Sequence, residues 1–417
     1  MESPLEEGNP LSRTFVLISL LLLASIAAVS AAAKSGGGPY TTDHDLWRAS
    51  ANGFAAWHLA GVSRGADGVL RLDPTTALTE TDPYATGSYQ GHNYYNGGSY
   101  LVGEATSPEI ASAPFTEAIP SWNADTPDGS WVETQIRAHV GDHWTKWYTA
   151  GPWASGTTAL ERHSVNLQAD GVDGTFAVDT LILNGKKAPP ADAYQLKIRL
   201  FSTADVIPAV RFASVALSGT APTRPTLQAG DPANWGTLVD LPGYSQMVYP
   251  DGGNVWCSPT SLSMVLAHWL DYTGTPEPRV RQTVEGVYDW RYDGHGNWPF
   301  NTAWAGHEGM EAQVARFSSF QDVERWVKAG VPVIFSFAWR KGDLTGSAIP
   351  SSDGHLAVIV GFDDSGNPIV NDPASATNED VRRTYDRAEL ETIWLEASGG
   401  TVYLVYPQGF ATPTLGS

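Results

Sequence analysis

Hydrophobic and polar residues alternate along much of the first half of the chain. In the segment 131–140, WVETQIRAHV, the even positions are apolar or small, and positions 133, 135 and 137 carry charged or amide side chains. The segment 194–201, YQLKIRLF, repeats this pattern, and 174–183 and 209–217 add two shorter runs. A period of two with one polar face predicts antiparallel strands that pack on one side. With turn signals such as NADTPDGS between the runs, the pattern predicts a β-sandwich domain over 40–217.

This alternation stops at residues 218–236, SGTAPTRPTLQAGDPANWG, whose composition is typical of an interdomain linker. Beyond it the pattern predicts two helices, at 259–270 and 320–330, with Gly330 just past the end of the second. Strand-like apolar runs lie at 331–339, 355–363, 367–372 and 400–407. A helix followed by a sheet predicts an α+β domain. The expected fold class is therefore multi-domain, with an N-terminal all-β sandwich and a C-terminal α+β domain, and 417 residues suffice for both.

Composition narrows the range of partners and the compartment. The net charge is −20 and Lys and Arg form no cluster, so a phosphate backbone would be repelled and nucleic acid is excluded as a partner. Only 17% of the residues are charged, while Gly, Pro and Trp number 42, 28 and 16. Such a mixture favours turn-rich β structure outside the cell.

The N-terminus predicts export. An apolar run at 14–33, TFVLISLLLLASIAAVSAAA, follows Arg13 and ends in small residues that offer cleavage after Ala31 or Ala33. We expect residues 1–33 to be a signal peptide and the mature protein to be secreted and extracellular. The alternative is an uncleaved signal anchor that holds the protein on a membrane, because the run is just long enough to span a bilayer.

A single cysteine, Cys257, stands in GGNVWCSPTS, so no disulfide can form within the chain. Pro259 favours the first turn of a helix, which makes Ser258 a plausible cap and places Cys257 at or just before the helix N-terminus. The unpaired N–H groups and the positive dipole end there lower a thiol pKa and produce the nucleophilic thiolate. The alternative is an inert buried thiol, which is common in proteins.

A thiolate needs a base, and His355 opens an apolar strand in GHLAVIVGFDDSGNPIVNDPAS. The next strand ends in VND, and the turn DDSGN would pair the two strands and bring His355 near Asn371 or Asp372. An amide or a carboxylate there holds the imidazole in the correct tautomer. A histidine at a strand end can equally be idle, and a DP pair is also an ordinary strand exit.

Four segments together resemble the papain-like cysteine peptidases: 244–266, 330–337, 354–375 and 385–395. In particular they resemble the bacteriocin-processing type, family thirty-nine of the cysteine peptidases, among its exported bacterial members, here with an N-terminal β domain. The resemblance covers 237–410. It implies a papain-like fold with the cysteine at the start of the central helix and the histidine and the acid on the facing sheet.

The resemblance also implies roles for four residues. Cys257 would be the nucleophile, His355 the general base and Asp372 its orienting acid, while Gln246, eleven residues before the cysteine, matches the oxyanion-hole glutamine. Asp372 is preferred to Asn371 because the family's acid precedes a proline and because a carboxylate stabilises an imidazolium more strongly than an amide. Ser258 departs from the usual Gly or Ala and is expected to crowd the pocket nearby.

These residues imply an exported cysteine peptidase that acts on a peptide or protein substrate and needs no cofactor and no metal. Another thiol acyl-transfer enzyme, an amidase or a transglutaminase-like enzyme, remains an alternative, as does an inactive extracellular binding protein. His139 and His143 lie four apart, but Gly141 and the strand pattern argue against a zinc site. Because every matched position lies beyond the linker, we expect residues 237–417 to fold without the sandwich.

Two groups of aromatic residues leave their roles open. Those of the β domain either stack on sugar rings, giving a carbohydrate or cell-wall contact, or fill the core: Tyr94, Tyr95, Trp122, Trp144, Trp147 and Trp153. Those between the cysteine helix and the next helix either line the substrate groove or pack internally: Trp290, Trp298 and Trp304.

Overall fold

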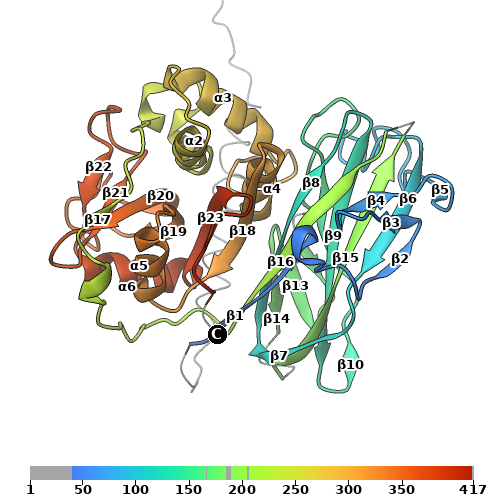
Figure 1. Cartoon of the computed structure of the whole chain (residues 1–417), viewed down its shortest axis with the longest axis horizontal. Helices are drawn as coiled ribbons and strands as arrows, with labels where there is room; N and C mark the ends of the chain where they lie inside the picture. Colours follow the sequence, from blue (N-terminus) through green and yellow to red (C-terminus); the bar gives the residue numbers. More distant parts are fainter. Residues whose placement is uncertain (1–39, 166, 185–188, 204–205, 416–417) are drawn as a thin grey trace, which may run out of the picture.

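The computed structural model describes residues 40–415, apart from 166, 185–188 and 204–205 (Figure 1). The predicted signal peptide at 1–33 lies outside the described residues. Among the residues described, no helix is both long and apolar enough to cross a membrane. The chain forms a β-rich half, blue to green in Figure 1, and an α+β half, yellow to red, which lie side by side.

The N-terminal half consists of two antiparallel sheets. The first has the order β12 (Leu167–Ala169), β13 (Gly174–Ala177), β14 (Thr180–Leu183), β8 (Glu117–Asp125), β16 (Ala209–Ser218), β4 (Leu70–Leu72) and β3 (Val62–Arg64), with β1 (Thr42–Arg48) on β16. The second has the order β10 (His143–Trp144), β9 (Ser130–Val140), β15 (Ala191–Ser202), β6 (Ser99–Thr106) and β2 (His58–Ala60). In that sheet β11 (Tyr148–Trp153) pairs with β9, β5 (Leu78–Thr81) with β6, and β7 (Ile110–Phe115) with β15.

The predicted alternation places the core of this sandwich. Val132 and Ile136 of β9 and Leu196 and Ile198 of β15 are fully buried in one cluster between the sheets. Burial of apolar area on this scale is the main force that stabilises such a sandwich. The all-β part of the predicted fold class is confirmed.

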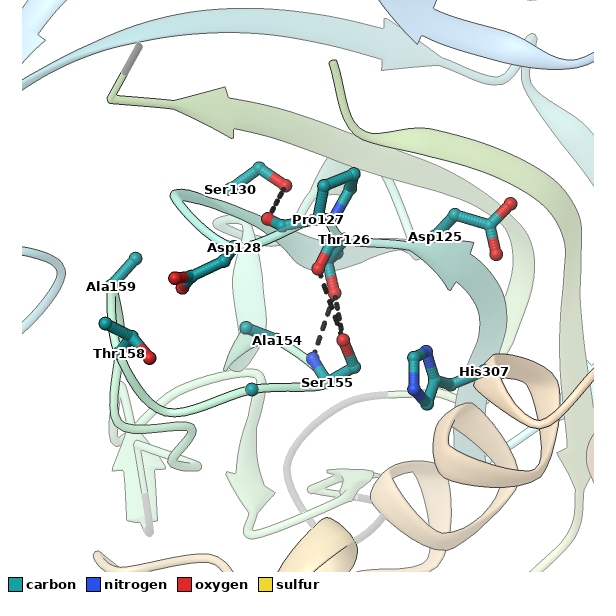
Figure 2. Close-up of a pocket in the computed structure, with 11 residues that line it drawn as sticks. Asp125, Thr126, Pro127, Asp128, Ser130, Ala154, Ser155, Thr158, Ala159 and His307 are labelled. Atoms are coloured by element: carbon teal, nitrogen blue, oxygen red, sulfur yellow. Dashed lines mark hydrogen bonds between the residues drawn. The ribbon is translucent and has the colours of Figure 1, made fainter. Parts of the chain in front are cut away.

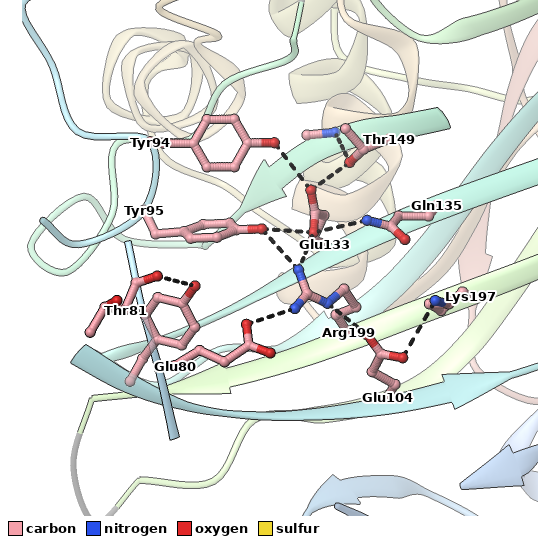
Figure 3. Close-up of polar contacts among 12 residues, drawn as sticks. Glu80, Thr81, Tyr94, Tyr95, Glu104, Glu133, Gln135, Thr149, Lys197 and Arg199 are labelled. Atoms are coloured by element: carbon pink, nitrogen blue, oxygen red, sulfur yellow. Dashed lines mark hydrogen bonds and ion pairs between the residues drawn. The ribbon is translucent and has the colours of Figure 1, made fainter. Parts of the chain in front are cut away.

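The opposite face of β9 differs from the expected solvent-facing surface. Glu133 is only 1% exposed because the segment that carries Tyr94 and Tyr95 covers it (Figure 3). Its carboxylate accepts hydrogen bonds from Tyr95 Oη at 2.9 Å, Thr149 Oγ1 at 2.7 Å and Arg199 Nη1 at 3.1 Å. These partners compensate the burial of the charge, which would otherwise be strongly unfavourable. The two tyrosines therefore belong to an internal polar network.

Of the other aromatic residues considered for sugar stacking, Trp122 and Trp153 are fully buried core residues. Trp144 and Trp147 are half-buried on the outer face, with the Arg137 guanidinium 4.8 and 4.7 Å from their ring centres. Only these two rings therefore remain as candidates for contact with a carbohydrate.

The C-terminal half is built on an antiparallel sheet flanked by helices. The sheet order is β18 (Met310–Arg316), β23 (Thr401–Pro407), β19 (Val333–Trp339), β20 (Ser352–Phe362), β21 (Pro368–Asn371) and β22 (Arg382–Thr384), with β17 (Thr237–Leu238) on β20. The helices are α2 (Cys257–Trp269), α3 (Pro276–Val287), α4 (Trp298–His307), α5 (Phe320–Lys328) and α6 (Arg387–Ser398). The α+β part of the predicted fold class is confirmed as well.

Most of the predicted elements lie where the sequence places them, with two differences. The first predicted helix begins two residues earlier, at Cys257, and its N-cap is Trp256, which gives no side-chain hydrogen bond, so Ser258 is not the cap. Helices α3, α4 and α6 and strands β18 and β22 were not predicted. As expected, α5 ends just before Gly330, whose φ of +90° suits a glycine.

The predicted linker is bound to the C-terminal half along part of its length. Asp231 caps a short 3₁₀ turn at Pro232–Asn234, and its N–H donates to Glu324 Oε2 at 2.9 Å. Trp235 Nε1 donates to Glu324 Oε1 at 2.6 Å, and Arg387 pairs with the same carboxylate. This part of the predicted linker is therefore fixed to the surface of α5 and is not a flexible connection.

The two halves share an extensive interface in which β8 and β16 pack against α4 and β18 (Figure 1). Asn123 of β8 donates to Ala312 O at 2.8 Å and accepts from Ala312 N at 3.0 Å, while Ser121 Oγ accepts from Val314 N at 3.0 Å. These side chains satisfy the backbone groups along the edge of β18, which an excised fragment would expose.

The hydrophobic cores also cross the boundary. Ile119 and Ala216 of the first sheet belong to the C-terminal core cluster, and Phe300 and Ala303 of α4 belong to the N-terminal one. That residues 237–417 fold alone stays a prediction, although an excised fragment would expose these shared core residues. Periodicity along single strands shows which face is apolar but not that another domain covers it.

Candidate active site

The only cysteine is the first residue of α2, a helix buried along most of its length. Cys257 itself is partly exposed, whereas Ser258 and Pro259 behind it are buried. The N-cap residue, Trp256, leaves the first N–H groups of the helix without a side-chain acceptor. A thiolate at this position is stabilised by those N–H groups and by the positive end of the helix dipole.

His355 on β20 and Asp372, directly after the adjacent strand β21, lie next to each other. His355 Nε2 is 2.8 Å from Asp372 Oδ1, and the two residues are 2% and 0% exposed. His355 is also hydrogen-bonded to Cys257. Since Nε2 is engaged by Asp372, the bond to the thiol falls to Nδ1. The structure thus brings three of the four predicted residues together in one chain of contacts.

Asn371, the competitor of Asp372, faces away from the histidine. Its Oδ1 accepts a hydrogen bond from Arg382 Nε at 3.1 Å, and its amide nitrogen lies 3.9 Å from the sulfur of Met264. This opposition follows from the alternation of side chains along an extended strand. The contact with the imidazole therefore belongs to Asp372.

The three groups shift one another's pKa values. Enclosure alone would raise the pKa of the Cys257 thiol, but His355 and the backbone N–H groups of Leu356 and Ser258 lower it overall. Burial alone would lower the pKa of His355, but Asp372 and Cys257 raise it to about 10. Burial would also raise the pKa of Asp372, yet the neighbouring imidazolium holds it below its usual value. Each shift is toward the charged form, as a thiolate–imidazolium pair backed by a carboxylate requires.

Aromatic rings enclose the imidazole. The ring centres of Phe337 and Trp339 lie 5.2 and 5.6 Å from that of His355, both edge to face. The two rings stack on each other at 5.1 Å along β19. This arrangement limits rotation of the imidazole and keeps water away from its bond to Asp372.

Gln246 lies in a 3₁₀ turn, Gln246–Val248, that precedes the cysteine helix. Its side chain is 3% exposed, and Nε2 donates to Gly253 O at 2.7 Å, which leaves one Nε2 hydrogen free. The turn is tied to the loop after Asp372, because Gln246 N donates to Pro373 O at 2.8 Å. The same loop therefore positions both the glutamine and the acid.

Comparison with known proteins gives this arrangement a family. Residues 43–218 match the family described as the Peptidase C39 N-terminal domain, of actinobacterial type, and residues 238–402 match the Peptidase C39 like family. The chain belongs to the peptidase C39-like family. The two matched regions correspond to the β-sandwich and to the α+β half that carries Cys257.

No curated protein matches the chain. Among solved structures, TmCBM61 in complex with β-1,4-galactotriose is similar, with 6% identity, 42% of this chain and 88% of that chain covered, and a TM-score of 0.19. A family two carbohydrate esterase from Cellvibrio japonicus has 13% identity, covers 55% and 51% of the two chains, and gives a TM-score of 0.16. Likenesses this slight carry no argument about what this C39-like protein binds.

The residue after the cysteine does not crowd the cleft of this family member. Ser258 is 1% exposed, and its Oγ lies 2.9 Å from Asn301 Oδ1 and 3.0 Å from Tyr403 Oη. The hydroxyl therefore belongs to a buried network behind the cysteine, and the expectation that it narrows the pocket is wrong.

Tyr385, which contacts the acid, escaped sequence reasoning. Tyr385 Oη donates to Asp372 Oδ2 at 2.7 Å, and Ala374 N donates to Oδ1 of the same carboxylate at 2.9 Å. Tyr385 follows β22, and its N–H bonds to Pro368 O across the sheet. Predicting that β21 pairs with β22 would have placed this hydroxyl near Asp372, but β22 is too short to show a pattern.

A surface hollow lies away from these residues. It has a volume of about 630 Å³ and opens at the boundary of the two halves, between the loops that carry Asp128 and Ser155 and the end of α4 at His307 (Figure 2). Cys257, His355 and Asp372 do not line it.

Within the described part of the chain, no three His, Cys, Asp or Glu side chains gather as a metal site. His139 pairs with Asp192, and His143 pairs with Asp142 and Asp173.

Proposed function

We propose that this C39-like protein is an exported cysteine peptidase that hydrolyses peptide bonds of a peptide or protein substrate. The observation that carries the proposal is the chain of contacts from Cys257 to His355 and from His355 to Asp372 at 2.8 Å. An inert structural cysteine has no need of an imidazolium held by a buried carboxylate.

The reaction follows from the residues in this order. The Cys257 thiolate attacks the carbonyl carbon, and His355 gives its proton to the departing amine as the C–N bond breaks. Gln246 Nε2–H and the backbone N–H of Cys257 donate to the developing oxyanion. Water then attacks the thioester while His355 accepts a proton, and the carboxylic acid leaves with the thiolate restored. Asp372 keeps the imidazole oriented and stabilises its charged form.

The test uses the secreted protein beside its Cys257→Ala variant. Both are incubated with a proteome-derived peptide library, and new N-termini are identified by mass spectrometry. We expect new N-termini with the unaltered protein and none with the variant. Release of ammonia without new N-termini would instead show an amidase, and isopeptide products would show a cross-linking enzyme. No product of any kind, with a thiol that alkylates no faster than free cysteine near pH 6, would show a binding protein.

For the N-terminal domain we propose a carbohydrate or cell-wall contact at the outer face that carries Trp144 and Trp147. Their half-buried rings lie beside Arg137 and Lys197, which offer hydrogen-bond donors next to an aromatic surface. Sedimentation with insoluble peptidoglycan tests this. The double variant Trp144→Ala and Trp147→Ala should remain in the supernatant, and equal sedimentation of both proteins would contradict the proposal.

A further inference from the structure

A buried carboxylate in the C-terminal half is bound by the N-terminal half. Asp289, in the loop between α3 and α4, is 0% exposed. Its Oδ1 accepts a hydrogen bond at 3.0 Å from the backbone N–H of Ser164, a residue of the N-terminal domain that is also 0% exposed. The same oxygen accepts from the N–H groups of Arg291 and Tyr292, each at 3.1 Å. Asp289 therefore shapes its own loop and joins that loop to the sandwich.

The second oxygen of this carboxylate continues toward α4. Asp289 Oδ2 accepts from Asn297 Nδ2 at 2.9 Å, and Asn297 caps α4 by accepting from Phe300 N at 3.2 Å. The backbone carbonyl of Asn297 accepts from Asn301 Nδ2 at 2.9 Å. The amide of Asn301 thus stands one step further along a line of bonds that starts in the N-terminal domain.

The line ends beside the nucleophile. Asn301 Oδ1 accepts from Ser258 Oγ at 2.9 Å, and Ser258 Oγ also lies 3.0 Å from Tyr403 Oη. Ser258 follows Cys257 directly, and its backbone N–H helps to lower the pKa of the Cys257 thiol. A Gly or Ala, usual at this position, has no hydroxyl, so the serine provides the last contact of the series, the bond from Ser258 Oγ to Asn301 Oδ1.

Every member of the series is shielded from water. Asn297 and Ser258 are each 1% exposed, and Asn301 is 0% exposed. In such surroundings a hydrogen bond is strong, neighbouring bonds reinforce one another, and a group left without its partner is costly. A change at one end is therefore felt further along the series.

A second grip holds the same loop. Arg162, in the N-terminal segment next to Ser164, donates from Nη1 to Glu285 O at 2.6 Å, in the last turn of α3. Trp290 stacks on His92 of the N-terminal domain with ring centres 4.0 Å apart and donates from Nε1 to Glu161 O at 3.1 Å. The sandwich thus clamps the α3–α4 loop on both sides of Asp289.

We propose that this relay, from Ser164 through Asp289, Asn297 and Asn301 to Ser258, makes the N-terminal domain a positioning element of the active site. The four residues after Ser164 act through one another to hold the first turn of α2, and with it the sulfur and backbone N–H of Cys257. The inference rests on the proposed function in one respect, namely that Cys257 carries out acyl transfer.

The test measures Cys257 without a peptide substrate. The first measurement is the pH dependence of its alkylation by iodoacetamide. The second is the release of p-nitrophenolate from p-nitrophenyl acetate, in which the thiolate displaces the phenolate and water then hydrolyses the thioester. Three variants of the full-length protein are compared: Ser258→Ala at the near end, Asp289→Asn at the far end, and Ser121→Ala as the control. Ser121 also makes a buried bond across the domain boundary, to Val314 N, but lies outside the relay.

We expect Ser258→Ala and Asp289→Asn each to move the alkylation midpoint to higher pH and to slow acyl transfer by about tenfold, the effect of losing one buried hydrogen bond. The double variant should be no slower than about the slower single variant, because both changes break the same series. Ser121→Ala should lower the melting temperature and leave both measurements unchanged.

Two results would overturn the relay. One is a folded Asp289→Asn protein with the alkylation profile and acyl-transfer rate of the unaltered protein. The other is a double variant whose losses multiply. Should Asp289→Asn not fold, Asn297→Ser replaces it in the comparison of the single and double variants. Serine still caps α4 but does not reach Asp289. If the unaltered protein reacts in both assays yet cleaves no peptide, the proposed peptidase function is refuted. The comparison of the variants in the two assays still tests the relay.

Discussion

Two buried carboxylates, Glu133 in the N-terminal domain and Asp372 in the C-terminal domain, have nearly the same surroundings. They are 1% and 0% exposed. Each accepts a hydrogen bond from a tyrosine, Tyr95 Oη at 2.9 Å and Tyr385 Oη at 2.7 Å. Each also pairs with a cationic side chain, and the difference between the two sites lies in that partner.

Glu133 pairs with Arg199, which keeps its proton at all ordinary pH values and also binds Glu80 and Glu104 (Figure 3). Asp372 pairs with His355, which also interacts with the partly exposed Cys257. The first site is closed and can only hold the fold together. The second contains a titratable partner, His355, and a partly exposed thiol. A buried ion pair therefore indicates a catalytic site only when one partner can lose its proton and also contacts an accessible reactive atom.

The largest expected effect tests the reactive member of this comparison. Asp372→Ala should lower kcat/KM about 10²–10⁴-fold, because the imidazole loses both its orientation and its charge partner. Asn371→Ala, the adjacent control, should retain most of kcat/KM and lower stability, since Arg382 loses an acceptor. Measuring both variants after verifying the fold by circular dichroism decides between them. A greater loss of kcat/KM in Asn371→Ala would reverse the assignment.

The corresponding change in the closed site should affect stability alone. Glu133→Ala removes the acceptor shared by Tyr95, Thr149 and Arg199, and breaking a buried pair in this way costs about 3–5 kcal/mol. Urea denaturation measures the free energy of unfolding, and the alkylation rate of Cys257 in the folded fraction is the control. If that rate also falls, the two networks are coupled and the contrast between them does not hold.

Sequence reasoning found the candidate active site more completely than the closed site at Glu133, and for a physical reason. Cys257, His355 and Asp372 are marked by local features of the sequence: the start of a helical pattern, the start of an apolar run and the end of another. Glu133 stands on the polar side of its strand, and alternation assigns such a residue to solvent. Only the covering segment with Tyr94 and Tyr95 buries it, and no pattern in β9 records that segment.

The same limit explains what was missed around the cysteine. Tyr385 and Asn301 reach the site through strand pairing and helix packing between segments far apart in the sequence. The interface of β8 with β18 was missed for the same reason, since Asn123 and Ser121 satisfy backbone groups of another domain. Periodicity describes one element at a time, whereas these contacts depend on which elements meet.

A smaller effect is expected for Gln246→Ala, a change that tests the oxyanion hole separately from the Cys257–His355 ion pair. Gln246→Ala should leave alkylation of Cys257 nearly intact, because the pair needs only Cys257 and His355. Turnover of a cleaved peptide should fall about 10²–10³-fold, as is typical for the loss of one oxyanion donor. Comparing the two rates in one preparation provides the control. An equal loss of both would mean that Gln246 supports the fold through its bond to Gly253.

The smallest expected effect is that of removing the Tyr385 hydroxyl, which binds Asp372 as the Tyr95 hydroxyl binds Glu133. Tyr385→Phe removes one hydrogen bond to Asp372 and leaves the imidazole pair in place, so kcat should fall about tenfold or less with KM unchanged. The hydroxyl helps to hold the pKa of Asp372 down, so without it the carboxylate is more basic and a stronger partner for the imidazolium. The pKa of His355, raised to about 10 in the unaltered protein, should therefore rise further, and the pKa of Cys257 should fall because its cationic neighbour is more favoured.

The pH range in which the thiolate–imidazolium pair exists should thus widen although kcat falls, which the pH profiles of alkylation and of kcat measure. Tyr95→Phe, the matched change at Glu133, should leave these profiles unchanged. A Tyr385→Phe profile that narrows or stays unchanged would show that the hydroxyl does not act through Asp372.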